Sequence, residues 1–139
     1  MKVRSLIVTT LWVCLSSSPV FAGEAVDGFN PATAQSWLAQ IDSGNYARSW
    51  KESSAYFRGA MTEKGWVDAL NGARKPLGKL ISRKLAKRQN ARSLPGAPDG
   101  NYVVMQFAAS FENKKDAVET VTFMRERDGN WKAAGYYIK

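Results

Sequence analysis

The sequence of 139 residues contains no histidine and only one cysteine, Cys14. Without histidine the chain cannot form a Ser-His-Asp triad, and zinc or copper sites built on imidazole and thiolates are not expected. Because Cys14 falls in a leader that we expect to be removed, the remaining chain would also lack a thiol nucleophile and a disulfide. Neither a Gly-rich phosphate loop nor a nucleophile elbow is present. These absences favour a protein with no catalytic residues, no metal and no cofactor.

Residues 1–22 have the features of a secretory signal peptide. Lys2 and Arg4 form a positive start, residues 6–15 form an apolar run, and Ala22 supplies a small residue at the expected cleavage position. The apolar run has ten residues, whereas a membrane-spanning helix needs about 20. We therefore predict an exported protein of the periplasm or the extracellular space, with residues 23–139 as one domain and no transmembrane segment after cleavage.

The positive charge is concentrated in one part of the chain. The formal net charge is +8, and eight basic residues lie within residues 74–92, where there is no acidic residue. Such a segment either binds an anionic surface or polymer or protects an exposed sheet edge from pairing with another strand. We favour edge protection, and we expect no nucleic-acid binding because the segment has no aromatic residue on which a base could stack. The candidate polyanion-binding residues are Lys79, Lys84, Lys87, Arg88 and Arg92.

Helical patterns occupy the first half of the remaining chain. Asn30 and Pro31 are typical of a helix start, and apolar residues at helical spacing follow as far as Ile41. A second, shorter helix is expected over residues 46–52, and a third is expected after Thr62, over residues 63–73. The sequence therefore predicts about three helices before the chain changes its periodicity.

Beyond Gly78 the apolar period becomes two. In the first strand, Ile81, Arg83, Leu85 and Lys87 are expected to share one face. Three further strands are expected over residues 102–111, 118–125 and 131–138. This order predicts an α+β fold in which about three N-terminal helices pack on a four-stranded antiparallel meander. The arrangement is similar to the cone of nuclear-transport-factor-2-like or cystatin-like domains.

The C-terminal half also carries an unusual series of motifs. The segments are Pro-Leu-Gly at 76–78, Leu-Pro-Gly-Ala-Pro-Asp-Gly at 94–100, Val-Glu-Thr-Val-Thr at 118–122 and Trp-Lys-Ala-Ala-Gly-Tyr-Tyr at 131–137. This series resembles the bacterial exported domain-of-unknown-function family 4019, and the resemblance covers nearly all of residues 32–139. It implies an exported bacterial protein and brings no established activity or site residue.

Four residues are candidates for ligand binding: Arg83, Glu119, Trp66 and Tyr137. Arg83 and Glu119 each lie on an otherwise apolar strand face, where an unpaired charge would be costly. The two would meet at the rim of a pocket, or, as we favour, they form a structural ion pair or lie near strand ends where each charge reaches water. Trp66 lies in a helical apolar stripe, which is also typical of a core residue.

The last strand carries two adjacent tyrosines, Tyr136 and Tyr137, which must point to opposite faces. We expect Tyr136, with Ala134 and Ile138, to form a second apolar sheet face, and a second copy of the chain to cover it as a homodimer. The sequence thus favours a non-catalytic domain that binds a small ligand, a second copy or an envelope component. The alternative is binding of an envelope surface or polyanion through residues 74–92.

Overall fold

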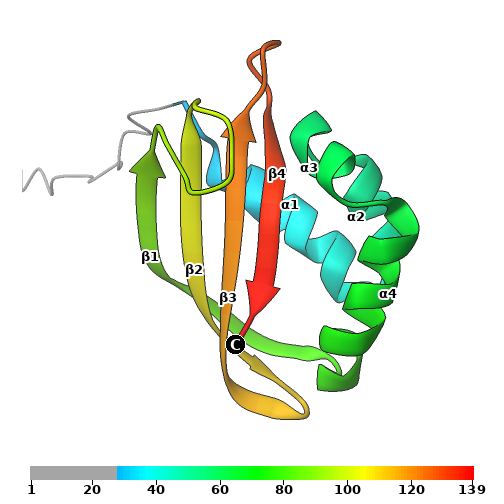
Figure 1. The fold of residues 1–139 in the computed structure, drawn as a ribbon. Helices are drawn as coiled ribbons and strands as arrows, with labels where there is room; N and C mark the ends of the chain where they lie inside the picture. Colours follow the sequence, from blue (N-terminus) through cyan, green and yellow to red (C-terminus); the bar gives the residue numbers. More distant parts are fainter. Residues whose placement is uncertain (1–27) are drawn as a thin grey trace, which may run out of the picture.

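The structure is a computed structural model that describes residues 28–139, so the expected signal peptide at residues 1–22 lies outside the described residues. Helices come first and strands last (Figure 1). The elements are α1 (Pro31–Asp42), α2 (Tyr46–Lys51), α3 (Ala55–Ala60), α4 (Glu63–Ala73), a 3-10 turn η1 (Lys75–Leu77), β1 (Leu80–Ala91), β2 (Tyr102–Phe111), β3 (Lys114–Arg125) and β4 (Trp131–Ile138). The strands form one antiparallel sheet in the order β1-β2-β3-β4. The predicted α+β fold is confirmed.

Four α-helices are present where the sequence predicted about three. Side chains that cap the backbone explain most of the helix starts: Asn30 accepts from the Ala32 amide, Ser54 from the Phe57 amide and Thr62 from the Gly65 amide. The missed helix is α3, which has six residues and buries only Phe57. A helix this short has no repeating apolar stripe, and for that reason periodicity does not reveal it.

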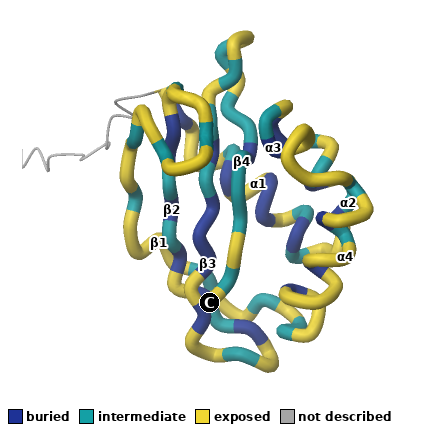
Figure 2. Tube along the Cα trace, viewed as in Figure 1, coloured by how far each residue is buried: buried dark blue, intermediate teal, exposed yellow. Residues whose placement is uncertain are grey.

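One face of the sheet forms the core with the helices. In Figure 1, α1 lies across this face, and α2, α3 and α4 lie beyond β4. The buried side chains of α1 include Trp37, Leu38 and Ile41, and they belong to one cluster with Val121 and Phe123 of β3 (Figure 2). The Trp37 ring lies 6.2 Å from both Trp66 and Phe123. The stability of the domain therefore depends on a core rich in aromatic rings.

Two irregularities in β1 change the direction of its side chains. The pairing with β2 shifts between Leu80 and Ser82 and again between Leu85 and Lys87. Arg83 therefore lies opposite Ala109 on the helix-covered face, while Lys87 lies opposite Gln106 on the other face. The expectation that Lys87 shares a face with Arg83 and Leu85 is wrong, because a bulge reverses the alternation. β1 is an edge strand, as the edge-protection interpretation requires.

The two tyrosines of β4 do point to opposite faces, but not as the sequence suggested. Tyr136 lies opposite Val121 and packs on the core, where its ring is 5.7 Å from Trp37 and 6.2 Å from Trp66. Tyr137 is half-exposed on the opposite face. The expectation that Tyr136 forms a second apolar face is therefore wrong, because its ring completes the aromatic core. Among residues 28–139, no helix is both long and apolar enough to cross a membrane.

Candidate functional site

The most concentrated group of charges lies between the helices and the sheet. It joins five residues from separate parts of the chain: Asp42 at the end of α1, Arg74 after α4, Arg83 on β1, Glu119 on β3 and Tyr136 on β4. The topology brings these residues together because β1 and β3 both flank β2 and because the C-terminal end of α1 reaches the same part of the sheet. We call these five residues the charge network.

Arg83 is the centre of the charge network. Its Nε and Nη2 donate to the two carboxylate oxygens of Glu119 at 2.7 and 3.1 Å. Its Nη1 and Nη2 donate to the two oxygens of Asp42 at 2.8 and 2.9 Å. One guanidinium therefore binds two carboxylates in bidentate fashion, which is the strongest geometry for this kind of pair. The expected contact between Arg83 and Glu119 is present.

Burial makes the charge network energetically important. The Glu119 side chain has no exposed surface, and that of Arg83 is 14% exposed. Burial acts to lower the pKa of Arg83, but the hydrogen bonds that Arg83 donates to Asp42 and Glu119 outweigh it and raise that pKa. Burial, together with the negative charge of Glu119, raises the pKa of the Tyr136 phenol. Both side chains are therefore held in their protonated forms at neutral pH.

Most polar groups of the charge network are occupied within it, and the exception is the buried Arg74 Nε, which has no hydrogen-bond partner. Tyr136 donates its hydroxyl to Glu119 Oε2 at 2.5 Å, and Arg74 donates to Asp42 at 3.2 Å and to the Gly78 carbonyl at 2.6 Å. Two carboxylates balance two guanidinium groups, and the Arg74 guanidinium also lies 4.3 Å from the centre of the Phe111 ring. A carboxylate held in this way is a poor general base, because it must first leave its arginine. The arrangement is that of a structural network.

The other two predicted ligand-binding residues lie apart. Trp66 is buried in the core, where its indole Nε1 donates to the Ser49 hydroxyl at 2.9 Å and its ring is 5.0 Å from Phe57. Tyr137 lies on the face of the sheet away from Arg83 and Glu119. The structure thus brings Arg83, Glu119 and Trp66 to the same side of the sheet and leaves Tyr137 on the other.

The basic segment of residues 74–92 is divided among three surroundings. Arg74 and Arg83 are buried in the charge network, and Arg88 lies with its guanidinium 5.4 Å from the centre of the Phe29 ring. The remaining cations of the segment are exposed: Lys75, Lys79, Lys84, Lys87 and Arg92. Asp42 and Glu119, which lie far away in sequence, therefore neutralise part of the charge that appeared unopposed in the sequence.

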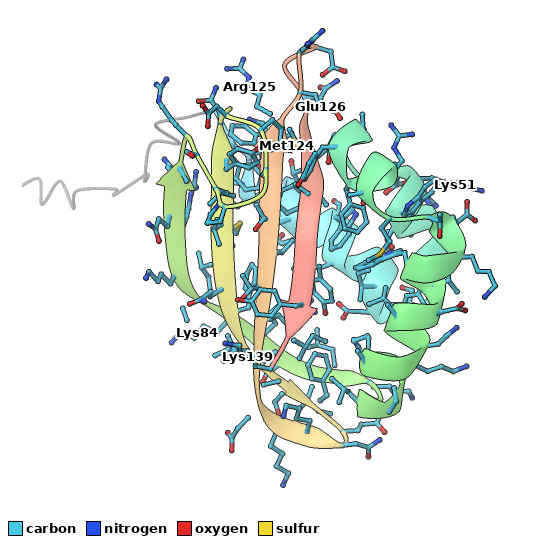
Figure 3. The ribbon with its side chains drawn as sticks, viewed as in Figure 1. Lys51, Lys84, Met124, Arg125, Glu126 and Lys139 are labelled. Carbon is cyan, nitrogen blue, oxygen red and sulfur yellow. The ribbon has the colours of Figure 1, made fainter. Side chains whose placement is uncertain are left out.

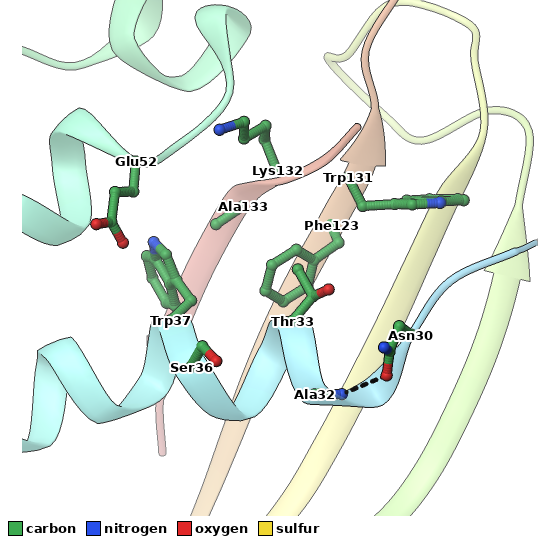
Figure 4. Close-up of a pocket in the computed structure, with 10 residues that line it drawn as sticks. All are labelled: Asn30, Ala32, Thr33, Ser36, Trp37, Glu52, Phe123, Trp131, Lys132 and Ala133. Atoms are coloured by element: carbon green, nitrogen blue, oxygen red, sulfur yellow. Dashed lines mark hydrogen bonds between the residues drawn. The ribbon is translucent and has the colours of Figure 1, made fainter. Parts of the chain in front are cut away.

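A cleft of about 400 Å³ opens between the start of α1 and the strands β3 and β4 (Figure 4). Its lining residues are Asn30, Ala32, Thr33, Ser36, Trp37, Glu52, Phe123, Trp131, Lys132 and Ala133. Aromatic rings of Trp37, Phe123 and Trp131 form its apolar part (Figure 4). None of the four ligand-binding residues predicted from the sequence lines this cleft.

Sequence reasoning missed the cleft, although one signal for it was available. Asn30, Thr33 and Ser36 recur at intervals of three residues, so they place a row of small polar side chains along one side of α1. Glu52 and Lys132 add charges of opposite sign, and Glu52 also accepts from Arg48 at 2.8 Å. The cleft can therefore contact an apolar group on its aromatic side and polar groups on its helical side. Within residues 28–139, no cluster of three or more acidic, histidine or cysteine side chains could hold a metal ion.

The model of the family "protein of unknown function (DUF4019)" matches residues 33–136, which is most of the chain. The chain belongs to the DUF4019 family. This confirms the family that the C-terminal motifs indicated. No curated protein matches the chain. The matched region of this DUF4019 chain begins within α1 and ends within β4, so it includes the whole charge network and all of the cleft lining except Asn30 and Ala32.

Proposed function

We propose that this DUF4019 chain is a non-catalytic binding domain whose cleft, between α1 and the strands β3 and β4, holds a small amphipathic ligand. The observation that carries the proposal is the division of the cleft into an aromatic side and a polar side. Its volume of about 400 Å³ falls in the range of about 300–1,000 Å³ that is typical of small-molecule sites. Such sites are lined by apolar and aromatic side chains with a few polar groups that fix orientation.

The lining also limits the chemistry of the ligand. An apolar group of the ligand would pack on Trp37, Phe123 and Trp131. Hydrogen-bond donors or acceptors of the ligand would meet the hydroxyl groups of Thr33 and Ser36. Glu52 and Lys132 supply one negative and one positive charge, which suit a zwitterion. An amino acid or a short peptide with an apolar side chain combines these features.

The charge network supports binding in preference to catalysis. Each of its carboxylates accepts at least two hydrogen bonds, and both receive them from Arg83. A general base or nucleophile needs an accessible lone pair beside a bound substrate. The buried network lies outside the cleft, whose lining does not include any of its members.

The leader at residues 1–22 supports export, and the family resemblance supports a bacterial source. We infer that the domain acts in the periplasm or outside the cell, where an envelope component or a diffusible ligand is its partner. The helices laid on a meander sheet also support a cone-like fold of the nuclear-transport-factor-2-like or cystatin-like kind. Export can be tested by N-terminal sequencing of the protein from the natural host, which should begin at Gly23.

The cleft is tested by filling it. In Ser36→Trp, a large side chain replaces an exposed lining residue of α1, whereas Gln35→Trp puts the same side chain at an exposed position of α1 that does not line the cleft. The probes are phenylalanine, leucine and the dipeptide leucyl-phenylalanine, and binding is followed by saturation-transfer NMR and calorimetry. We expect at least one probe to bind the wild type and the Gln35 variant, and Ser36→Trp to weaken that binding at least tenfold.

Two results would contradict the proposal. One is the absence of saturation transfer from all three probes at millimolar concentration. The other is equal affinity in the Ser36 and Gln35 variants. Thermal unfolding of each variant shows that the fold is retained, because both positions are exposed on α1 and a new surface ring should change stability little.

A further inference from the structure

The face of the sheet away from the helices carries an ordered arrangement of lysines. We call this face the outer sheet face. One row across it consists of Lys84, Ala108, Val118 and Lys139: register joins the first three, and two backbone hydrogen bonds of 3.0 Å join Val118 to Lys139. The next row consists of Lys87, Gln106, Thr120 and Tyr137. The two rows place three lysines at the margins of the sheet and uncharged side chains in the middle.

The centre of the second row lies lower than its margins. Thr120 is only 5% exposed, and its hydroxyl has no hydrogen-bond partner in the structure. Gln106 beside it is half-buried, while Lys84 and Lys87 on one margin are exposed. On the other margin Tyr137 is 50% exposed. The second row is thus recessed and polar at its centre, whereas the first row exposes the apolar side chains of Ala108 and Val118 between its lysines.

The charge of these two rows, which we call the strip, is not balanced locally. Its two rows contain no acidic residue, and within residues 28–139 no carboxylate forms an ion pair with Lys84, Lys87 or Lys139. Along β3, Asp116 lies near the start of the strand, two residues before Val118, and Glu119 points to the opposite face. Because neighbouring strands are about 4.8 Å apart, the margins are about 14 Å apart. A partner that neutralises both margins must therefore be extended and anionic.

We propose that the outer sheet face binds an acidic polysaccharide that lies across the strands. Its carboxylate or sulfate groups would meet Lys84, Lys87 and Lys139, and its hydroxyl groups would meet Gln106. The exposed ring of Tyr137, with the Lys139 ammonium 5.9 Å from its centre, offers an apolar surface to a sugar ring and a cation beside it. This site is separate from the cleft and uses only part of the basic segment.

Other occupants fit this surface less well. A second copy placed on the same face would bring lysine margins against lysine margins, which costs free energy unless anions intervene. A bilayer favours a continuous apolar surface, whereas the exposed apolar side chains of the two rows, Ala108, Val118 and Tyr137, lie between lysines and beside the polar Gln106 and Thr120. Single-stranded nucleic acid favours several stacking rings, and the two rows offer only Tyr137. An acidic polysaccharide uses the lysine margins, the amide of Gln106 and the ring of Tyr137.

The test compares two variants with the same change of charge. Lys84→Gln/Lys87→Gln/Lys139→Gln removes the cations of the strip, and Lys51→Gln/Arg58→Gln/Lys64→Gln removes three exposed cations of the helices. In Figure 3, Lys84 and Lys139 lie at the sheet, whereas Lys51 lies on the helical side. The probes are polygalacturonate, which carries carboxylates, and heparin, which carries sulfates as well. Neutral dextran serves as the blank.

We expect the wild type and the helix variant to bind at least one acidic probe within twofold of each other, and the strip variant to bind it at least tenfold more weakly. The slope of log K against log salt should fall by about two to three units in the strip variant, one for each lost contact. Tyr137→Ala should weaken binding without changing that slope. Binding of polygalacturonate alone or of heparin alone supports the proposal and identifies the acidic group.

Four outcomes would overturn the proposal. The first is that neither acidic probe binds at low salt, and the second is that the two triple variants lose affinity equally. The third is a dimer in light scattering that Tyr137→Ala dissociates, because a second copy would then occupy the face. The fourth is that the protein binds duplex DNA or phosphatidylglycerol vesicles as tightly as the polysaccharides, because this would show a general attraction of anions instead of a specific site.

Discussion

Removal of Arg83 should destabilise the domain more than removal of any surface charge, and Arg83→Met is the sharpest change to make. Methionine keeps an unbranched side chain of similar length, but Glu119 loses the two hydrogen bonds that it accepts from Arg83, those from Nε at 2.7 Å and from Nη2 at 3.1 Å. Glu119 then keeps the Tyr136 hydroxyl, and Asp42 keeps Arg74. Breaking a buried ion pair on one side costs about 3–5 kcal/mol, because a buried charge remains uncompensated.

Adding Glu119→Leu to Arg83→Met should restore part of the lost free energy of unfolding. Glu119→Leu alone leaves Arg83 with Asp42 and should also destabilise the domain. In the double variant no buried charge is left without its partner, and replacement of a buried pair by apolar residues is often neutral or stabilising. We expect the double variant to be more stable than the sum of the two single losses indicates, by about 2–3 kcal/mol.

The assay is urea unfolding followed by tryptophan fluorescence, since Trp37 and Trp66 are buried beside the network's Tyr136. The exposed pair Arg48–Glu52 provides the matched cycle, because its Nε–Oε1 distance of 2.8 Å is similar and its side chains are 67% and 41% exposed. Arg48→Met/Glu52→Leu should show a coupling of less than about 0.5 kcal/mol. Additive losses at Arg83 and Glu119, or a coupling no larger than that of the exposed pair, would refute the reasoning.

Tyr136→Phe tests the pH dependence of the network: because the folded pKa of Tyr136 is raised, its contribution is present below the unfolded pKa of about 10 and is lost as pH rises above it. Between pH 10 and 11, urea titrations should therefore show the wild type losing about 1 kcal/mol more than Tyr136→Phe, and parallel curves would contradict this. Ser49→Ala should cost about 1–3 kcal/mol in urea unfolding, since it removes the buried acceptor of the Trp66 indole, and a loss below 0.5 kcal/mol would count against it. Gly78→Ala should lower the melting temperature, because φ is +76° and an added Cβ would lie 3.0 Å from Glu112. Gly72→Ala in α4 should raise the melting temperature, because alanine favours a helix more than glycine does, and equal shifts in the two variants would contradict both reasons.

The fold was predictable because most of its elements carry their own local signals. α1 begins at a capping asparagine followed by proline, and its buried residues repeat at helical spacing. β2 shows strict alternation of its buried residues from Val103 to Phe111. α3 escaped prediction because its single buried ring, Phe57, gives no repeat. Where local periodicity is present it specifies the element, and a six-residue helix is too short to show it.

The partial prediction of the charge network has a physical reason. An isolated charge on an apolar strand face implies a partner, and this identified Arg83 and Glu119 as a pair. Asp42 and Arg74 were not identified in this way, because both lie at helix ends, where a charged side chain is ordinarily solvated. Their roles depend on how the end of α1 meets β1 in three dimensions. Residues such as Arg83 and Glu119 can be identified because a charge at their positions is unfavourable without a partner. Their further partners, Asp42 and Arg74, lie at positions that are favourable for a charge in any case.

The distribution of lysine and arginine in the basic segment follows the difference between buried and exposed positions. Both arginines with buried guanidinium groups, Arg74 and Arg83, make several directional hydrogen bonds, whereas Lys84 and Lys87 lie exposed on the outer sheet face. A planar guanidinium can satisfy two carboxylates at once, and a lysine ammonium is a strongly hydrated point charge that is costly to bury. Arg83→Lys should therefore fail to replace Arg83 in the network although it keeps the charge. The bulge between Leu85 and Lys87 then separates the two uses, because it turns Lys87 away from the core and toward the outer sheet face.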